Sequence, residues 1–136
     1  MEFRCLGLCT EEQWPVLARG AELFGEQTGL NLALEHFLRR EDLLYRLREG
    51  RCDTAIVALP GALGMESVLG VRGLNRHLPL IWISDDEVFA MQSYRLGVQM
   101  FLRFPVTSKE VAGAMARCAC PAGFVGESQG GGTNGL

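Results

Sequence analysis

Short apolar runs alternate along the chain with stretches in which apolar residues recur at helical spacing. The apolar runs predict five strands, at residues 3–8, 30–37, 54–58, 80–84 and 98–102. The stretches that follow them predict five helices, at residues 10–28, 40–49, 65–74, 86–96 and 107–117. Regular alternation of strands and helices is typical of a parallel sheet that is covered by helices on both faces. The pattern therefore predicts an α/β fold.

The strands differ in how deeply we expect them to be buried. The runs at 54–58 and 80–84 are apolar throughout, which is typical of central parallel strands with both faces covered. The run at 30–37 alternates between apolar and polar residues and predicts a half-buried strand at an edge of the sheet.

Two helices carry a capping signal at their start. Thr10 precedes Gln13, and Thr107 precedes Glu110, at the spacing of a capping box. These signals place the starts of the first and last helices directly after strands. The helix at 65–74 is expected to be weak, because glycine is unfavourable inside helices and two lie within it.

Length and composition are those of one ordinary domain. The chain has 136 residues, of which 48% are hydrophobic, so it can bury a core. No apolar run approaches the roughly 20 residues of a membrane-spanning helix, and the N-terminal residues do not resemble a signal peptide. We therefore expect a cytoplasmic protein without a membrane partner. Residues 119–136 are glycine-rich and lack periodicity, which predicts a flexible tail after a domain at 1–118.

Charge and cysteine usage exclude several kinds of site. The net charge is −3, and the densest basic stretch, residues 39–51, is interleaved with acidic residues, so we expect no nucleic-acid partner for this domain. The five cysteines include no Cys-x-x-Cys pair, which favours structural roles over redox or zinc chemistry. His36 and His77 have no evident nucleophile beside them in the sequence, which gives no support to a catalytic role.

Four segments combine an apolar run with particular turn residues. They are Asp-Thr-Ala-Ile-Val-Ala-Leu-Pro-Gly at 53–61, His-Leu-Pro-Leu-Ile-Trp-Ile-Ser at 77–84, Ala-Met-Gln-Ser-Tyr-Arg-Leu-Gly at 90–97 and Phe-Leu-Arg-Phe-Pro-Val at 101–106. Together these segments resemble the receiver domain of bacterial response regulators, and most of all the LytR/AlgR type. The resemblance implies a flavodoxin-like (βα)5 three-layer sandwich, whose parallel five-stranded sheet has the strand order 2-1-3-4-5.

The resemblance also implies where the chemistry of such a domain would lie. Receivers bind Mg²⁺ through an acid pair after the first strand and accept a phosphoryl group on an Asp that ends the third strand. A hydroxyl and a Lys then bind the phosphate. The matching positions here are Cys9 and Thr10 for the acid pair, Ala58 for the phosphoacceptor and Phe104 for the Lys, while Ser84 retains the hydroxyl. The chain therefore resembles a degenerate pseudo-receiver with no catalytic residue, metal or cofactor.

A domain of this kind would act through its surface. In the family, the fourth helix, fifth strand and fifth helix form the face that binds partners. The matching candidate residues here are Phe89, Met91, Gln92, Arg95, Gln99, Met100, Arg103 and Lys109. The resemblance thus implies a non-catalytic member of a two-component or phosphorelay system, which contacts a second copy of itself or a signalling protein without being phosphorylated.

Other functions stay open at this stage. The chain could be a working receiver with an unconventional phosphoacceptor, or the N-terminal part of a transcriptional regulator. A small-ligand binder would use Thr10, Gly61, Gly64 and Ser84 in the crevice at the carboxyl ends of the strands.

A metal site would use the acids that follow the first and fourth strands. These are Glu11, Asp85 and Asp86. The competing interpretation is that acids in the first turn of a helix stabilise the helix dipole.

Overall fold

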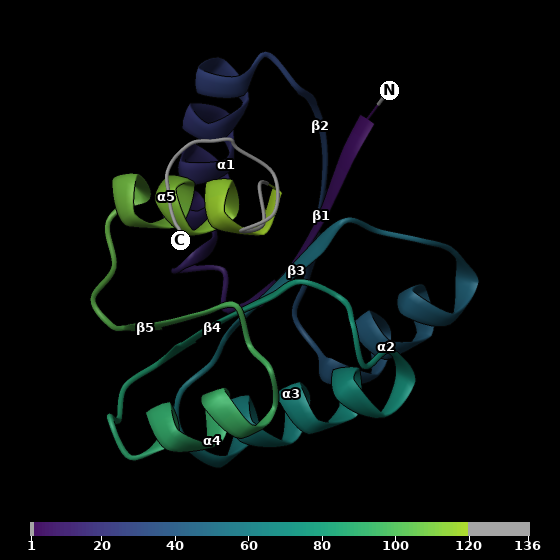
Figure 1. Ribbon diagram of the computed structural model, residues 1–136, viewed down its shortest axis with the longest axis vertical. Helices are drawn as coiled ribbons and strands as arrows, with labels where there is room; N and C mark the ends of the chain where they lie inside the picture. Colours follow the sequence, from purple (N-terminus) through teal and green to yellow (C-terminus); the bar gives the residue numbers. More distant parts are fainter. Residues whose placement is uncertain (1, 120–136) are drawn as a thin grey trace, which may run out of the picture.

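The computed structural model describes residues 2–119 as a parallel sheet with helices on both faces (Figure 1). The elements are β1 (Glu2–Cys9), α1 (Trp14–Thr28), β2 (Asn31–Phe37), α2 (Arg40–Glu49), β3 (Thr54–Ala58), α3 (Gly61–Leu74), β4 (Leu80–Ser84), α4 (Phe89–Arg95), β5 (Met100–Arg103) and α5 (Ser108–Ala119). The strand order is β2-β1-β3-β4-β5 and every neighbouring pair is parallel. The predicted flavodoxin-like fold is confirmed.

The helices form two layers around the sheet. Helices α1 and α5 cover one face, whereas α2, α3 and α4 cover the other (Figure 1). Successive strand residues point to opposite faces, so Ile56 and Ala58 join the core beneath α1 and α5, while Ala55 and Val57 join the core beneath α2 and α3. Burial on both faces explains why β3 and β4 are continuously apolar.

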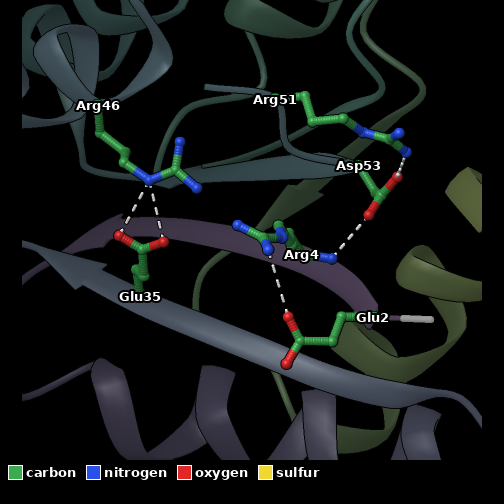
Figure 2. A network of polar contacts seen from close by, with 6 residues as sticks. All are labelled: Glu2, Arg4, Glu35, Arg46, Arg51 and Asp53. Carbon is green, nitrogen blue, oxygen red and sulfur yellow. Dashed lines mark hydrogen bonds and ion pairs between the residues drawn. The ribbon is translucent and has the colours of Figure 1, made fainter. Parts of the chain in front are cut away.

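The edge strand β2 is half-buried along most of its length, as predicted. Arg46 of α2 holds it from outside the sheet, since its Nε lies 3.1 and 3.0 Å from the two carboxylate oxygens of Glu35 (Figure 2). Beside it, the Asp53 carboxylate accepts the backbone amide of Arg4 at 2.7 Å and pairs with Arg51 at 3.3 Å. The first contact thus ties α2 to β2, and the second ties β1 to the residue that precedes β3.

Helix α3 begins at Gly61, four residues before the predicted start. Tertiary contacts compensate for its poor helix-forming sequence. The Gly61 amide donates to Asp85 Oδ1 at 3.0 Å, and Gly64 packs so closely on the Leu59 carbonyl that a Cβ at Gly64 could not be accommodated. The helix is therefore longer than its glycine content alone would allow.

Helix α4 and strand β5 are shorter than predicted. Asp86 Oδ1 accepts the Val88 amide at 2.9 Å, and this turn delays the start of α4 to Phe89. The Val98 amide donates back to Ser93 O at 3.0 Å, so the chain joins β5 only at Met100.

The two capping signals have different outcomes. The last helix has the complete capping box, because the Glu110 amide donates to Thr107 Oγ1 at 3.1 Å and Glu110 Oε1 accepts the Thr107 amide at 2.9 Å. At the start of the first helix, the Gln13 amide donates to Thr10 Oγ1 at 3.3 Å. Within residues 2–119, the Gln13 side chain does not accept the Thr10 amide in return. Residues 11–13 form turns instead, and α1 begins at Trp14.

The last described helix, α5, ends at Ala119, the first residue assigned to the predicted tail. The rest of that tail lies outside the described residues. Within residues 2–119, no helix has the length and apolar character required to cross a bilayer.

Candidate functional site

The carboxyl ends of β1, β3 and β4 meet at one edge of the sheet. The strand register places Cys9 opposite Ala58, Ala58 opposite Ile83, and Ser84 opposite Arg103. In parallel α/β sheets this edge forms the crevice in which ligands bind. The candidate residues identified from the sequence at the ends of β1, β3 and β4 are thus brought to one place.

The interior of this crevice is apolar. Cys9 and Ala58 are 0% and 1% exposed, and they belong to the same core cluster. Phe104 is half-buried and packs against that cluster. Ala58 ends in a methyl group and has no oxygen that could receive a phosphoryl group, and Phe104 has no ammonium that could offset phosphate charge.

An aromatic pair adjoins the end of β1. The rings of Trp14 and His36 are stacked, with centroids 4.5 Å apart and planes 2° from parallel. His36 Nε2 lies 2.9 Å from the Cys9 carbonyl oxygen and 3.6 Å from Cys9 Sγ. The position that resembles one half of the acid pair is therefore packed between the core and a histidine.

The sequence shows no nucleophile beside His36, but the fold brings the Cys9 thiol to it from the neighbouring strand. This pair nevertheless differs from a catalytic dyad. A histidine that activates a thiol must accept its proton, but Nε2 carries a hydrogen if it donates to the Cys9 carbonyl. Burial also raises the pKa of the Cys9 thiol to about 12, so the thiol stays protonated at neutral pH.

The remaining polar groups of the crevice are bonded to one another. Ser84 is buried, and its hydroxyl lies 3.3 Å from Asp85 Oδ1. The same carboxylate oxygen accepts the Gly61 amide at 3.0 Å. A carboxylate of the chain itself thus occupies the hydroxyl and the amide to which an external anion would bind. The sequence showed Asp85 but gave no sign that it would cross to the start of α3.

The other candidates for ligand or metal binding are also engaged locally. The Thr10 carbonyl accepts the amides of Gln13 and Trp14, each at 3.1 Å, and Asp86 caps the turn before α4. Across residues 2–119, no group of three or more His, Cys, Asp or Glu side chains could hold a metal ion. Glu11, Asp85 and Asp86 are therefore not brought together as ligands.

Three residues of the candidate interaction face point inward or serve the fold. Phe89 packs against Trp82, with ring centroids 5.4 Å apart. Gln99 uses its side-chain oxygen to accept the Leu80 amide at 2.7 Å. Met100 packs against the core beneath α1 and α5.

The rest of that face is more accessible. Met91, Arg95, Arg103 and Lys109 are exposed, and Gln92 is half-buried. Arg103 is paired with Glu87 at 3.5 Å.

Sequence analysis missed two exposed apolar residues next to this face. Val88, which precedes α4, and Tyr94 within it are 65% and 84% exposed, whereas Ser93 is the buried residue of this helix. Helical spacing could have identified them, since Val88, Met91 and Tyr94 recur every three residues and so lie along one side of α4.

Comparisons with known proteins agree with the fold. No protein-family model matches the sequence, and no curated protein matches it. Among solved structures, the response regulatory domain of MrkE from Klebsiella pneumoniae is similar with a TM-score of 0.69 and 10% identity, over 86% of this chain and 95% of that chain. HP1043, an orphan response regulator of H. pylori, is similar with a TM-score of 0.67 and 12% identity, over 85% of this chain and 95% of that one.

A third neighbour is the non-phosphorylated HemR receiver domain from Leptospira biflexa. Its TM-score is 0.65 and its identity 17%, over 85% of this chain and 93% of that chain. The chain thus has the fold of response-regulator receiver domains.

Proposed function

We propose that this domain is a non-catalytic pseudo-receiver of a two-component or phosphorelay system, related to the LytR/AlgR-type receivers whose motifs it resembles. It acts through protein–protein contacts that do not depend on phosphorylation. The observation that carries the proposal is the single apolar cluster formed by Cys9, Ala58 and Phe104 at the carboxyl edge of the sheet. A receiver needs carboxylates and an ammonium in these positions.

The hydrogen bonds around Asp85 support the same function. Phosphate on a receiver would be bound by the hydroxyl at the end of the fourth strand, but here that hydroxyl lies 3.3 Å from Asp85 Oδ1. An incoming anion would have to displace this carboxylate and would be repelled by its charge. The polar groups of the crevice are thus bonded to one another, and a phosphoryl group is not needed to hold them in this arrangement.

Phosphoryl transfer can be tested directly. The protein is incubated with acetyl phosphate and Mg²⁺, and its intact mass is measured over time beside a receiver domain that retains the acid pair, Asp and Lys. We expect the control to gain one phosphoryl group and this protein to gain none. A Mg²⁺-dependent gain of one phosphoryl group on this protein would refute the proposal and favour a receiver with an unconventional acceptor.

A further inference from the structure

A cavity of about 310 Å³ lies at the end of the sheet opposite to Ser84 and Asp85. It is formed by the ends of α3 and α4 and by the loops that lead from them into β4 and β5. The lining residues are Arg72, Arg76, His77, Arg95, Leu96 and Gly97. Because these loops precede their strands, the cavity is separate from the crevice at the carboxyl ends.

The charge of this region is of one sign. The stretches that build it, 67–84 and 88–109, contain no Asp or Glu, although the chain as a whole has a net charge of −3. Three arginines line the cavity and no carboxylate does. By contrast, the cavity of about 360 Å³ beside β1 contains two internal ion pairs, Glu2 with Arg4 and Arg51 with Asp53 (Figure 2).

Arg72 has a structural role in the wall of the cavity. Its guanidinium donates to the carbonyl oxygens of Leu96 at 2.6 Å, Leu78 at 2.8 Å, Gly97 at 2.9 Å and Asn75 at 3.2 Å. These carbonyl dipoles surround the cation where it is partly buried, and this burial lowers its pKa. An anion in the cavity would supply the counter-charge that Arg72 lacks.

The other two arginines do not serve the fold in the same way. Cations near helix ends often bind the last carbonyls, but Arg72 already takes several of these acceptors. Arg76 and Arg95 are exposed and form no ion pair or side-chain hydrogen bond with any other residue of 2–119. Their guanidinium groups are therefore free to bind an outside carboxylate or phosphate in two-pronged geometry.

The surface beside the cavity is apolar. Met91 lies four residues before Arg95, so the two share one side of α4, and Met91 is 62% exposed. The exposed apolar strip runs along α4 from Tyr94, next to Arg95 at the cavity, through Met91 to Val88, which precedes the helix at its other end. A free inorganic anion would use only the arginines, whereas a polypeptide with acidic and apolar side chains would use both surfaces.

We infer that the cavity of Arg72, Arg76 and Arg95, with the strip of Val88, Met91 and Tyr94 beside it, is the docking site for an acidic amphipathic segment of a partner protein. The inference rests on the proposed function, because it defines the partner class of a domain that works by contact. The arginines of the cavity would bind carboxylates of the segment, and the strip on α4 would cover the apolar side chains of the segment.

The test measures fluorescence anisotropy of a labelled helical peptide in which Glu and Leu lie on opposite faces, and of a matched peptide with Gln in place of Glu. Both are titrated with the native protein and with the R76Q/R95Q variant. The charge-matched control is R48Q/R117Q, which changes two exposed arginines outside the cavity. Met91→Ser tests the strip, with Tyr45→Ser on α2 as a control of equal exposure, 62%.

We expect the acidic peptide to bind the native protein and the Gln peptide to bind far more weakly. Loss of two arginine contacts should weaken binding about tenfold in R76Q/R95Q, and added salt should weaken native binding. Met91→Ser should also bind more weakly, whereas both controls should match the native protein. Circular dichroism verifies that every variant is folded.

The inference is overturned if the native protein fails to bind the acidic peptide, or if R76Q/R95Q binds it as tightly. It is also overturned if pyrophosphate or single-stranded DNA, used as a competitor, binds more tightly than the peptide. A self-association that is detected by sedimentation and abolished in R76Q/R95Q would likewise overturn it, because the surface would then bind a second copy of the chain. None of these results depends on the phosphorylation assay, so the inference can fail while the proposed function stands.

Discussion

Ala58 shows how one side chain sets the chemistry of the whole crevice. It ends the central strand, is 1% exposed, and shares its core cluster with Cys9 and Phe104. An ionised carboxylate here would have neither a cation nor an acid pair with a bound metal beside it. The apolar residues around Ala58 are therefore mutually dependent, because a single charged group placed among them would be buried without a partner.

Restoring the single Asp should consequently fail to restore a receiver. We expect Ala58→Asp to lower the free energy of unfolding by about 3 kcal/mol, because it buries a carboxyl group without a partner. Ala62→Asp is the matched control, since Ala62 is exposed in the first turn of α3, where the helix dipole favours a negative charge. Urea unfolding of both variants gives the comparison, and acetyl phosphate with Mg²⁺ gives the phosphorylation result. An Ala58→Asp protein that is stable and phosphorylated would show that the crevice retains the groups we consider lost.

At the scale of the elements, the contact between α1 and α5 depends on a glycine. A Cβ on Gly20 would lie 2.6 Å from the Val111 side chain and 2.9 Å from the Ser108 carbonyl oxygen. The Ser108 hydroxyl also donates to the Val16 carbonyl at 3.0 Å, which fixes the two helices at this distance. The layer that covers Cys9 and Ala58 is thus closely packed at one identifiable point.

Gly20→Ala should therefore destabilise the domain although alanine favours helices. We expect a loss of about 1 to 3 kcal/mol from overpacking. Gly113→Ala on α5 provides the control, because no atom lies within 4 Å of its added Cβ, and there the substitution should be neutral or stabilising by up to about 1 kcal/mol. Thermal unfolding of the two variants separates them. Equal stability of both would indicate that α1 and α5 can move apart.

The sequence was informative where local and long-range preferences agree. The covered parallel sheet and its buried central strands followed from the apolar runs at β3 and β4, the strand order followed from the resemblance, and Thr107 with Glu110 capped α5 as predicted. The early start of α3 was not predictable, because it depends on Asp85, which is distant in sequence.

Residues that meet across strands were missed for the same reason. His36 and Cys9 are 27 positions apart, and only the pairing of β1 with β2 brings them together. The aligned motif positions identified the residues that lie at the carboxyl ends of the strands, whereas the hydrogen bonds among Ser84, Asp85 and Gly61 could not be predicted.

At the scale of the whole molecule, the two ends of the sheet have opposite characters. The carboxyl end, where receivers bind a cation, has apolar side chains and the exposed Asp85 carboxylate, which lies 3.3 Å from the Ser84 hydroxyl. At the opposite end of β4 and β5, three arginines line a cavity whose lining residues include no Asp or Glu. Under the proposed function, such a distribution would attract an acidic partner to the arginine end of the sheet.

Buried thiols give the molecule a characteristic pH dependence. Burial raises the pKa of Cys9 to about 12 and that of Cys52 to about 11, and it also raises the pKa of Cys5 and Cys118. Above about pH 9 the unfolded chain loses these protons while the folded state keeps them, so the unfolded state binds fewer protons and stability falls as pH rises. The contribution of the protonated thiols to the free energy of unfolding is complete below about pH 8.5, and it is lost as the pH rises to the pKa values of the folded state.

We therefore expect the free energy of unfolding, measured by urea titration, to be constant near neutral pH and to fall steeply between pH 9 and 11, by up to about 1.4 kcal/mol per pH unit for each thiol held neutral. The stability of Cys9→Ala should decline less steeply with pH than that of the native protein, because one such thiol is absent. Lys109→Gln, at an exposed residue, is the control, and it should not change the difference in slope that Cys9→Ala causes. A Cys9→Ala profile that falls as steeply as the native one would mean that the Cys9 thiol ionises freely in the folded state. In that case the end of β1 would be open to solvent, and the apolar filling on which the proposed function depends would be absent.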